Sequence, residues 1–187
     1  MNHNYTAEYD NVRIRPLNKD DIELLREWRN NKSQTTFLRN VGYITPEMQM
    51  KWFEEYLADS SQMVFAIEET VDLNRLVGSM ALYDIKETQL EIGKIQIGDE
   101  DAHGRGIGRK SLVMGMKIAF DAMKIDKIVA AVHRDNTAAR TNDIRIGFRI
   151  TGQHNAVVGG IEDELEMTRE DLVKANPYID EISIKSV

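Results

Sequence analysis

A glycine-rich turn between an apolar strand pattern and a helix pattern constrains this chain more than any other feature of its sequence. The stretch 91–110 reads EIGKIQIGDEDAHGRGIGRK, and every second residue from 104 to 108 is glycine. These glycines remove side chains where a ligand could approach the backbone, and the following helix directs its first N–H groups to the same place. Arg105, Arg109 and Lys110 add positive charge. The segment therefore predicts an anion site for a phosphate or pyrophosphate.

The strand pattern before this turn changes phase. Leu90 and Ile92 stand on one parity and Ile95 and Ile97 on the other, so the change falls at Gly93–Lys94. One extra residue in the strand, a β-bulge, produces such a change. A bulge leaves backbone groups unpaired in the sheet, where they can bind a ligand.

Strands and helices are predicted along most of the chain. Alternating or continuous apolar patterns predict strands over 12–16, 63–68, 76–83, 89–97, 127–132, 148–157 and 161–167. Capping residues predict helices that begin after Asn18, Thr45, Asn136 and Thr168, in addition to the helix after the glycine turn. That last helix connects two strands, which implies a crossover and a parallel strand pair.

Length and composition limit the domain organisation. The 187 residues, of which 42% are hydrophobic, allow one domain with a core. We expect a single domain over 12–175, an extension over 1–11 and a tail over 176–187. The absence of cysteine excludes disulfides, thiolate metal sites and a cysteine nucleophile. The first residues lack the pattern of a signal peptide and no apolar run could span a membrane, so we expect a soluble, cytoplasmic protein.

Charge and motif spacing exclude several classes of function. The formal net charge of −7 argues against nucleic-acid binding, which needs clustered Lys and Arg, and is compatible with an amine-bearing partner. A dinucleotide fingerprint fails because Arg109 replaces its third glycine, and a P-loop fails because Arg109 separates Gly108 from Lys110. No histidines stand at metal-binding spacing, so we expect no metal site.

These features together resemble a known family. HGRGIG follows a bulged strand, and Asn136 stands eleven residues before Gly147–Phe148. In this combination the chain resembles the GNAT superfamily of acyl-CoA-dependent N-acetyltransferases, over residues 12–172. The family's phosphate loop reads Arg/Gln-x-x-Gly-x-Gly/Ala. His103 departs from its first residue, whereas both later glycines are present.

Three phrases resemble one branch of that superfamily. LREWRNN, ITPEMQMKWF and EIGKIQIG are similar to segments of ribosomal-protein N-terminal acetyltransferases, spermidine acetyltransferases and acetyltransferases of nucleotide-linked amino sugars. The run Trp28-Arg29-Asn30 favours the amino-sugar enzymes.

The resemblance implies an α/β fold of the mixed, α+β kind. A mostly antiparallel twisted sheet would contain a central splayed parallel pair and be flanked by helices. It also implies acetyl-CoA as co-substrate, without a metal. The glycine loop would hold the pyrophosphate, the strand edge after the bulge would pair with the pantetheine, and an N–H at the bulge would stabilise the oxyanion. The cofactor-binding residues that it implies are Ile95, Gln96, Ile97, His103, Gly104, Arg105, Gly106, Ile107, Gly108, Arg109, Lys110 and Asn136.

Two carboxylates are candidates for the chemistry. An ammonium has no lone pair, so the acceptor needs a general base, and Glu91 is the first candidate because it faces away from Leu90 and Ile92. The alternative for Glu91 is a solvated or salt-bridged strand carboxylate. Many family members place a tyrosine seven residues after the asparagine to protonate the thiolate, and here that residue is Asp143. Either Asp143 is protonated, another group serves, or the thiolate leaves unassisted.

Three functions remain open at this point. The first is acetyl transfer to the amine of a small molecule or amino sugar. The second is the same chemistry on a protein or peptide N-terminus, which would need an open acidic groove beside residues 32–42. The third is a non-catalytic CoA-binding protein, for which Asp143 is the best argument. The expected partner is thus a small-molecule or peptide amine, not a nucleic acid or a membrane, and the resemblance also allows a homodimer.

Overall fold

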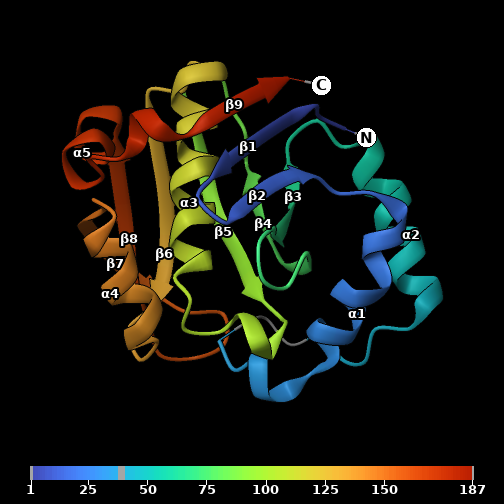
Figure 1. Cartoon of the computed structure of the whole chain (residues 1–187). Coiled ribbons are helices and arrows are strands. Elements are labelled where there is room, and N and C mark those ends of the chain that lie inside the picture. Colours follow the sequence, from blue (N-terminus) through green and yellow to red (C-terminus); the bar gives the residue numbers. More distant parts are fainter. Residues whose placement is uncertain (1, 38–40, 187) are drawn as a thin grey trace.

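The computed structural model describes residues 2–37 and 41–186, and Figure 1 shows its nine strands and the helices that flank them. The strands form one sheet in the order β7-β8-β6-β5-β4-β3-β2-β1-β9. Their bounds are β1 Tyr5–Tyr9, β2 Val12–Pro16, β3 Met63–Glu69, β4 Arg75–Tyr83, β5 Gln89–Ile97, β6 Lys127–His133, β7 Arg149–Asn155, β8 Ile161–Thr168 and β9 Ser183–Ser186. The helices are α1 Ile22–Asn30, α2 Pro46–Ala58, α3 Ile107–Lys117, α4 Thr137–Arg145 and α5 Arg169–Ala175.

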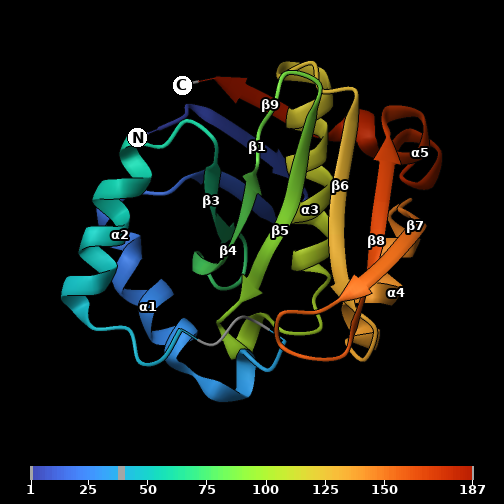
Figure 2. The same cartoon turned by 180° about the vertical axis from the view of Figure 1, so that it is seen from behind.

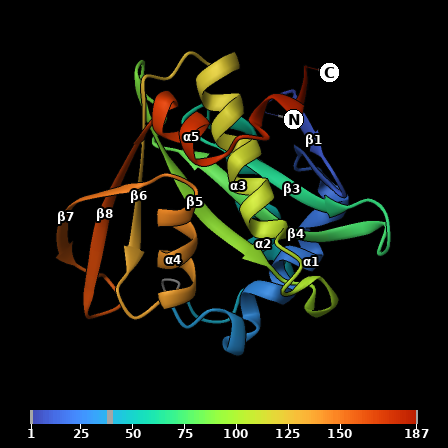
Figure 3. The same cartoon turned by 60° about the vertical axis from the view of Figure 1, so that its left-hand side comes forward.

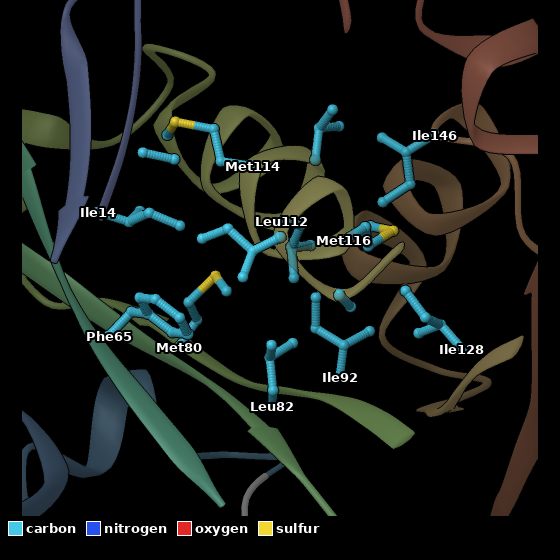
Figure 4. Packing of buried hydrophobic residues seen from close by; sticks show 14 of the residues in the cluster. Ile14, Phe65, Met80, Leu82, Ile92, Leu112, Met114, Met116, Ile128 and Ile146 are labelled. Atoms are coloured by element: carbon cyan, nitrogen blue, oxygen red, sulfur yellow. The ribbon is translucent and has the colours of Figure 1, made fainter. Parts of the chain in front are cut away.

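The sheet separates two layers of helices. Helix α3 crosses one face, and α1 and α2 pack against the other (Figure 3). The larger core lies between α3 and the sheet, where the helix supplies Leu112, Met114 and Met116 and the strands supply side chains such as Phe65 and Ile92 (Figure 4). A smaller core lies under α1 and α2. Burial of apolar area on both faces stabilises the sheet and fixes which strand residues face each helix layer.

The fold class predicted from the resemblance is confirmed. Every strand pair in the described sheet is antiparallel except β5 with β6, which is parallel. The β5–β6 register runs only from Gln89↔Lys127 to Glu91↔Val129, although both strands continue beyond it. Figure 2 shows the two strands close together at one end and apart at the other. This is the splayed central pair.

The predicted bulge is confirmed as well. The β4–β5 register shifts between Ser79↔Gln96 and Ala81↔Gly93, so two residues of β5 oppose one residue of β4. Lys94 lies in this bulge with φ of 50°, a left-handed conformation that a non-glycine residue adopts at some cost. The bulge turns Ile95 and Ile97 toward α3, so the apolar residues on both sides of it pack against the same core.

The chain ends differ from the expected extension and tail. β1 lies within 1–11 and β9 within 176–187, and the two pair with each other from Tyr5↔Ser186 to Glu8↔Ser183. Both strands are short, and the burial of β1 does not alternate along its length, so neither has the period of two by which a strand is recognised in a sequence. The sheet therefore includes both segments that flank the expected domain.

Candidate active site

A cavity of about 360 Å³ lies beside the end of β5, in the part of the strand beyond its parallel register with β6. Ile95, Gln96 and Ile97 line it, together with His103 from the loop that follows, so four predicted cofactor residues meet there. His103 Nε2 donates to the carbonyl oxygen of Ile97 at 2.8 Å, which ties the loop to the strand end. The cavity lies where the resemblance implies that the pantetheine arm pairs with the strand.

The glycine loop adopts the backbone shape that an anion site needs. Gly104 and Gly106 have φ of 75° and 72°, and a Cβ at either position would meet no other atom within 4 Å. Both need glycine for conformation and leave open space above the backbone. The first hydrogen bond of α3 runs from Lys110 N–H to Gly106 C=O at 3.1 Å, so the N–H groups of the three residues between them precede the helical ladder. These donors fit a pyrophosphate.

Two other members of the loop help to pack α3 against the sheet. The side chain of Ile107 is buried in the core, so only its backbone can contact a cofactor. Gly108 lies against β5, since a Cβ there would come within 3.5 Å of Ile95 Cδ1 and 3.6 Å of Ile97 Cγ1. These contacts position the first turn of α3 directly beside the 360 Å³ cavity.

The three cationic side chains of the loop point to different neighbours. Arg105 is exposed and contacts Asp72 at 3.0 Å. Lys110 Nζ donates to Asp10 at 2.6 Å and to the Asn11 side chain at 2.7 Å, in the β1–β2 turn.

Arg109 contacts the C-terminal part of the chain. Its Nη2 donates to Asn176 Oδ1 at 3.4 Å, and its buried Nε has no hydrogen-bond partner among the described residues. Of the three cations predicted for the loop, Arg105 is thus exposed at its surface, whereas Arg109 and Lys110 contact other parts of the chain.

Asn136 lies at the start of α4 and caps it. Its Oδ1 accepts the N–H of Ala139 at 3.2 Å. No residue of α4 is fully buried, so an apolar face contributes little to holding this helix on the sheet. The helix is tied down by an ion pair between Arg140 Nε and Asp163 Oδ2 at 2.7 Å, and Arg134, just before the helix, donates to the other oxygen at 2.7 Å. Hydrogen bonds from both arginines hold the pKa of the fully buried Asp163 below its ordinary value.

Glu91 lies on β5 just before the bulge, half-buried on the face opposite Leu90 and Ile92. Tyr83, its Cα partner on β4, donates from its hydroxyl to Glu91 Oε1 at 2.5 Å. Burial, with Glu91 beside it, raises the pKa of Tyr83 above its ordinary range, so the tyrosine remains a donor. Glu91 is therefore a held carboxylate at the last parallel pair before the strands separate.

Asp143 lies in the last part of α4 and is half-buried. Across the described residues, no side chain forms a hydrogen bond or ion pair with its carboxylate. Burial raises its pKa to about 6, because the charged form loses hydration without gaining a partner. Of the alternatives left open by the sequence, this environment favours a protonated carboxyl in weakly acidic solution.

A second cavity, of about 580 Å³, lies on the Glu91 face of the sheet, between the sheet and helices α1 and α2. Apolar side chains such as Leu25 and Trp52 form much of its wall, with Met48 near the start of α2. Met48, Trp52 and Tyr56 recur at every fourth residue of α2. Only Tyr56 is fully buried, and the other two line this cavity.

The segment before the undescribed residues contributes side chains that sequence reasoning missed. Phe37 lines the 360 Å³ cavity, and its ring centroid lies 5.2 Å from that of His133 at the end of β6. His133 Nε2 donates to the carbonyl oxygen of Gly159 at 2.8 Å, while its Nδ1 accepts the N–H of Asp135 at 3.2 Å. Phe37 thus reaches from the β5 side of the opening to the β6 side. Residues 32–42, beside which a peptide-binding groove would have to lie, are only partly among the described residues.

Two further properties hold for residues 2–37 and 41–186. No three or more histidine, aspartate or glutamate side chains come together there as metal ligands would. None of the helices in these ranges has the length and apolarity that crossing a bilayer requires.

Comparisons with known proteins agree with this geometry. Residues 11–149 match the model of the acetyltransferase (GNAT) domain. The probable N-acetyltransferase YjcK of Bacillus subtilis (strain 168) is 28% identical over 163 residues, which cover 82% of this chain and 90% of that protein. Acetyltransferase PseH of Campylobacter jejuni is 25% identical over 123 residues, which cover 66% of this chain and 73% of that protein.

Solved structures show the same fold. The spermidine N-acetyltransferase of Vibrio cholerae, in complex with CoA and spermine, superposes with a TM-score of 0.78 at 17% identity, covering 87% of this chain and 98% of that chain. At this identity the likeness establishes the fold alone. The domain match extends from the β1–β2 turn to the start of β7 and includes the bulge, the glycine loop and Asn136. The chain therefore belongs to the GNAT family of acetyltransferases, which use acetyl-CoA as the acetyl donor.

Proposed function

We propose that this protein transfers the acetyl group of acetyl-CoA to the primary amine of an amino sugar. One observation carries the choice of acceptor class. The 580 Å³ cavity on the Glu91 face has the size of a small-molecule site, and no aspartate or glutamate is among the described residues that line it. The alternative, a peptide N-terminus, would need an open acidic groove beside residues 32–42, and the described lining of the 360 Å³ cavity contains no acidic residue either.

The cofactor would lie along the loop and the strand edge. Backbone N–H groups at the start of α3 are the donors for the pyrophosphate, since they precede the first helical hydrogen bond. The backbone of Ile95 to Ile97 offers an edge for the pantetheine where β6 has moved away. Asn136 has its side-chain oxygen engaged in the helix cap, so its amide nitrogen is the group available to a ligand.

The reaction would proceed by direct attack. The amine nitrogen forms a bond to the carbonyl carbon of the thioester, and the carbon–sulfur bond breaks. Glu91, held by Tyr83, accepts a proton from the nitrogen, directly or through water. Asp143 in its protonated form returns a proton to the leaving sulfur. Its raised pKa supports this role, because an ionised aspartate has no proton to donate.

Calorimetric titration with acetyl-CoA, followed by thiol release against three panels of acceptors, tests this proposal. The panels are amino sugars, polyamines and peptides with free N-termini. We expect acetyl-CoA to bind and amino sugars to give the highest kcat/KM. Faster turnover of peptides would support the N-terminal alternative, and binding without turnover on any panel would support a non-catalytic role. An absence of acetyl-CoA binding would refute both the cofactor site and the reaction.

A further inference from the structure

The wall of the 580 Å³ cavity has the opposite charge to the chain as a whole. The sequence has 31 acidic and 24 basic residues. Nevertheless, the described residues around this cavity include two cations, Arg29 and Lys94, and no acid. The remaining lining residues are apolar, or polar and uncharged, such as Ser79 and Gln96. In a chain with an acidic excess, a cationic cavity wall is a local property and needs a local explanation.

The bulge in β5 determines where Lys94 points. Its left-handed backbone, with φ of 50°, takes it out of the alternation of the strand. Its Nζ lies 4.1 Å from the ring centroid of Tyr83, the residue that holds Glu91. The ammonium is therefore on the face of the proposed base, and its side chain is exposed toward the cavity.

Arg29 reaches the same cavity from α1. The side chain is half-buried, and burial lowers the pKa of its guanidinium, which nevertheless stays charged at any physiological pH. A guanidinium in this position can form charge-assisted hydrogen bonds with an anionic group that enters the cavity. Gln96 connects the two sides of this cavity, since it lies on β5 and its Nε2 donates to the carbonyl oxygen of Trp28 at 2.9 Å.

We propose that Arg29 and Lys94 bind an anionic oxygen group of the acceptor, a phosphate or a carboxylate, while the amine of the same molecule faces Glu91. This inference rests on the proposed function and specifies its substrate class as an amine that also carries negative charge. Guanidinium and ammonium groups form charge-assisted hydrogen bonds with such oxygens. The two cations also repel polyamines, whose several positive charges would lie beside them without an acidic partner on the described wall.

The cavity wall also suits the uncharged part of such a molecule. The indole of Trp52 lines the cavity and stacks on Tyr56, with ring centroids 5.7 Å apart and an interplanar angle of 11°. This stacking holds a flat apolar surface in a fixed orientation, on which the face of a sugar ring or another ring can pack. An acceptor with an apolar ring, a charged end and an amine matches the three parts of the site.

Matched acceptors test the inference. Glucosamine and glucosamine 6-phosphate differ only by the anionic group, and spermidine represents polycations. A nucleotide-linked amino sugar and glutamate distinguish a phosphate from a carboxylate source. We expect kcat/KM for glucosamine 6-phosphate to exceed that for glucosamine by about 10-fold to 100-fold, the range of a charge-assisted hydrogen bond. Preference for glutamate over both sugars would assign the anion as a carboxylate.

Variants connect that preference to the two cations. Arg29→Gln and Lys94→Gln should each lower the ratio of kcat/KM for glucosamine 6-phosphate to kcat/KM for glucosamine by about 10-fold, whereas Arg29→Lys should retain part of the preference. Lys51→Gln is the matched control. It removes one positive charge from α2 at a residue that is 77% exposed in its side chain and does not line the cavity.

Binding provides a second readout that does not depend on turnover. Glucosamine 6-phosphate is titrated into the CoA-loaded protein, and its affinity should fall about 10-fold in Arg29→Gln and in Lys94→Gln but not in Lys51→Gln. If acetyl transfer occurs and neutral and phosphorylated sugars react and bind equally, the anionic subsite is wrong and the proposed function stands. If the phosphorylated sugar binds through both cations without turnover, the subsite stands and the reaction is wrong.

Discussion

Tyr83 donates a hydrogen bond of 2.5 Å to Glu91 across the β4–β5 ladder, at the last residue pair before β5 and β6 separate. A half-buried tyrosine that stays protonated keeps one carboxylate oxygen fixed and leaves the other for a substrate proton. The relationship explains how a strand carboxylate with a cross-strand partner can still act as a base.

Replacing Glu91 tests this assignment directly. Glu91→Gln retains an acceptor for the Tyr83 hydroxyl but cannot take a proton, so we expect kcat to fall by about 100-fold to 10,000-fold. The affinity for acetyl-CoA, measured by calorimetry, should not change. Tyr83→Phe serves as the comparison, because it leaves the carboxylate present and should lower kcat much less. A Glu91→Gln enzyme with nearly unchanged kcat would mean that Glu91 is a structural strand residue.

The raised pKa of Asp143 predicts an effect on stability that depends on pH. The pKa of Asp143 is about 6 in the folded protein, whereas an ordinary aspartate, as in the unfolded chain, has a pKa of 3.8. The unfolded chain therefore releases this proton first as pH rises. The free energy of unfolding therefore falls between about pH 4 and pH 6, and it does not recover this loss at higher pH. Allowing for partial solvent exposure, Asp143→Asn should raise the free energy of unfolding by about 1 kcal/mol at pH 7.5 and leave it unchanged near pH 3.5.

Urea unfolding at the two pH values measures this difference. Equal gains at both pH values would show that the substitution acts through something other than ionisation of the carboxyl.

Activity should report the same ionisation. If the protonated carboxyl serves the leaving sulfur, kcat of the wild type should decrease as pH rises through about 6, and the slope should disappear in Asp143→Asn. A pH profile of kcat at saturating acetyl-CoA gives the answer. Identical profiles for the two proteins would indicate that the thiolate leaves without help from this residue.

The glycine loop predicts a sharp loss of cofactor binding on substitution. Gly106→Glu places a negative charge in open space above the N–H groups at the start of α3, and we expect no measurable acetyl-CoA binding by calorimetry. Gly159→Glu is the control for backbone strain, since Gly159 also has a left-handed φ, of 89°, and open space around its Cβ position. Wild-type affinity in Gly106→Glu would remove the phosphate site from the proposal.

The ion pair beneath α4 predicts an effect on binding from a residue outside the cavities. Asp163 is fully buried and binds both Arg134 and Arg140. Asp163→Asn should destabilise the protein by about 1 to 3 kcal/mol and raise KM for acetyl-CoA more than it lowers kcat, because α4 carries Asn136 at its start. Glu166→Gln is the control, because it also removes one negative charge from β8, and Glu166 pairs with Lys127 and Arg149 and not with α4. Equal KM values for the two variants would contradict this positioning role.

Local patterns were sufficient for the features that depend on neighbouring residues. The bulge at Gly93–Lys94 follows from a change of strand parity, and the Asn136 cap follows from a side chain before a helix. The opening between β5 and β6 follows from the family resemblance. The bulge and the cap are each encoded in a few consecutive residues, so both are visible in the sequence, whereas the opening was predicted only through the resemblance.

Features that depend on distant residues were not visible. Lys110 is recognisable in the sequence as a cation of the glycine loop, but not the contacts of its ammonium with Asp10 and Asn11, about a hundred positions earlier in the chain. The contact of Phe37 with His133 likewise joins two segments that no local pattern connects. The direction of Lys94 depends on a single left-handed residue, although the bulge itself was predicted. Tertiary neighbours decide where long polar side chains point, and the sequence alone does not place them.

The short ladder between β5 and β6 leaves backbone amides of Ile95 and Ile97 on one side, and of Ala131 and Val132 on the other, outside any shared parallel register. Amides that point into this gap have no parallel strand to protect them from hydrogen–deuterium exchange, and a pantetheine arm bound between the strands would act as the missing part of the ladder. Acetyl-CoA should then slow exchange along this seam and raise the melting temperature through linkage. The sheet of this enzyme would be complete only in its loaded state.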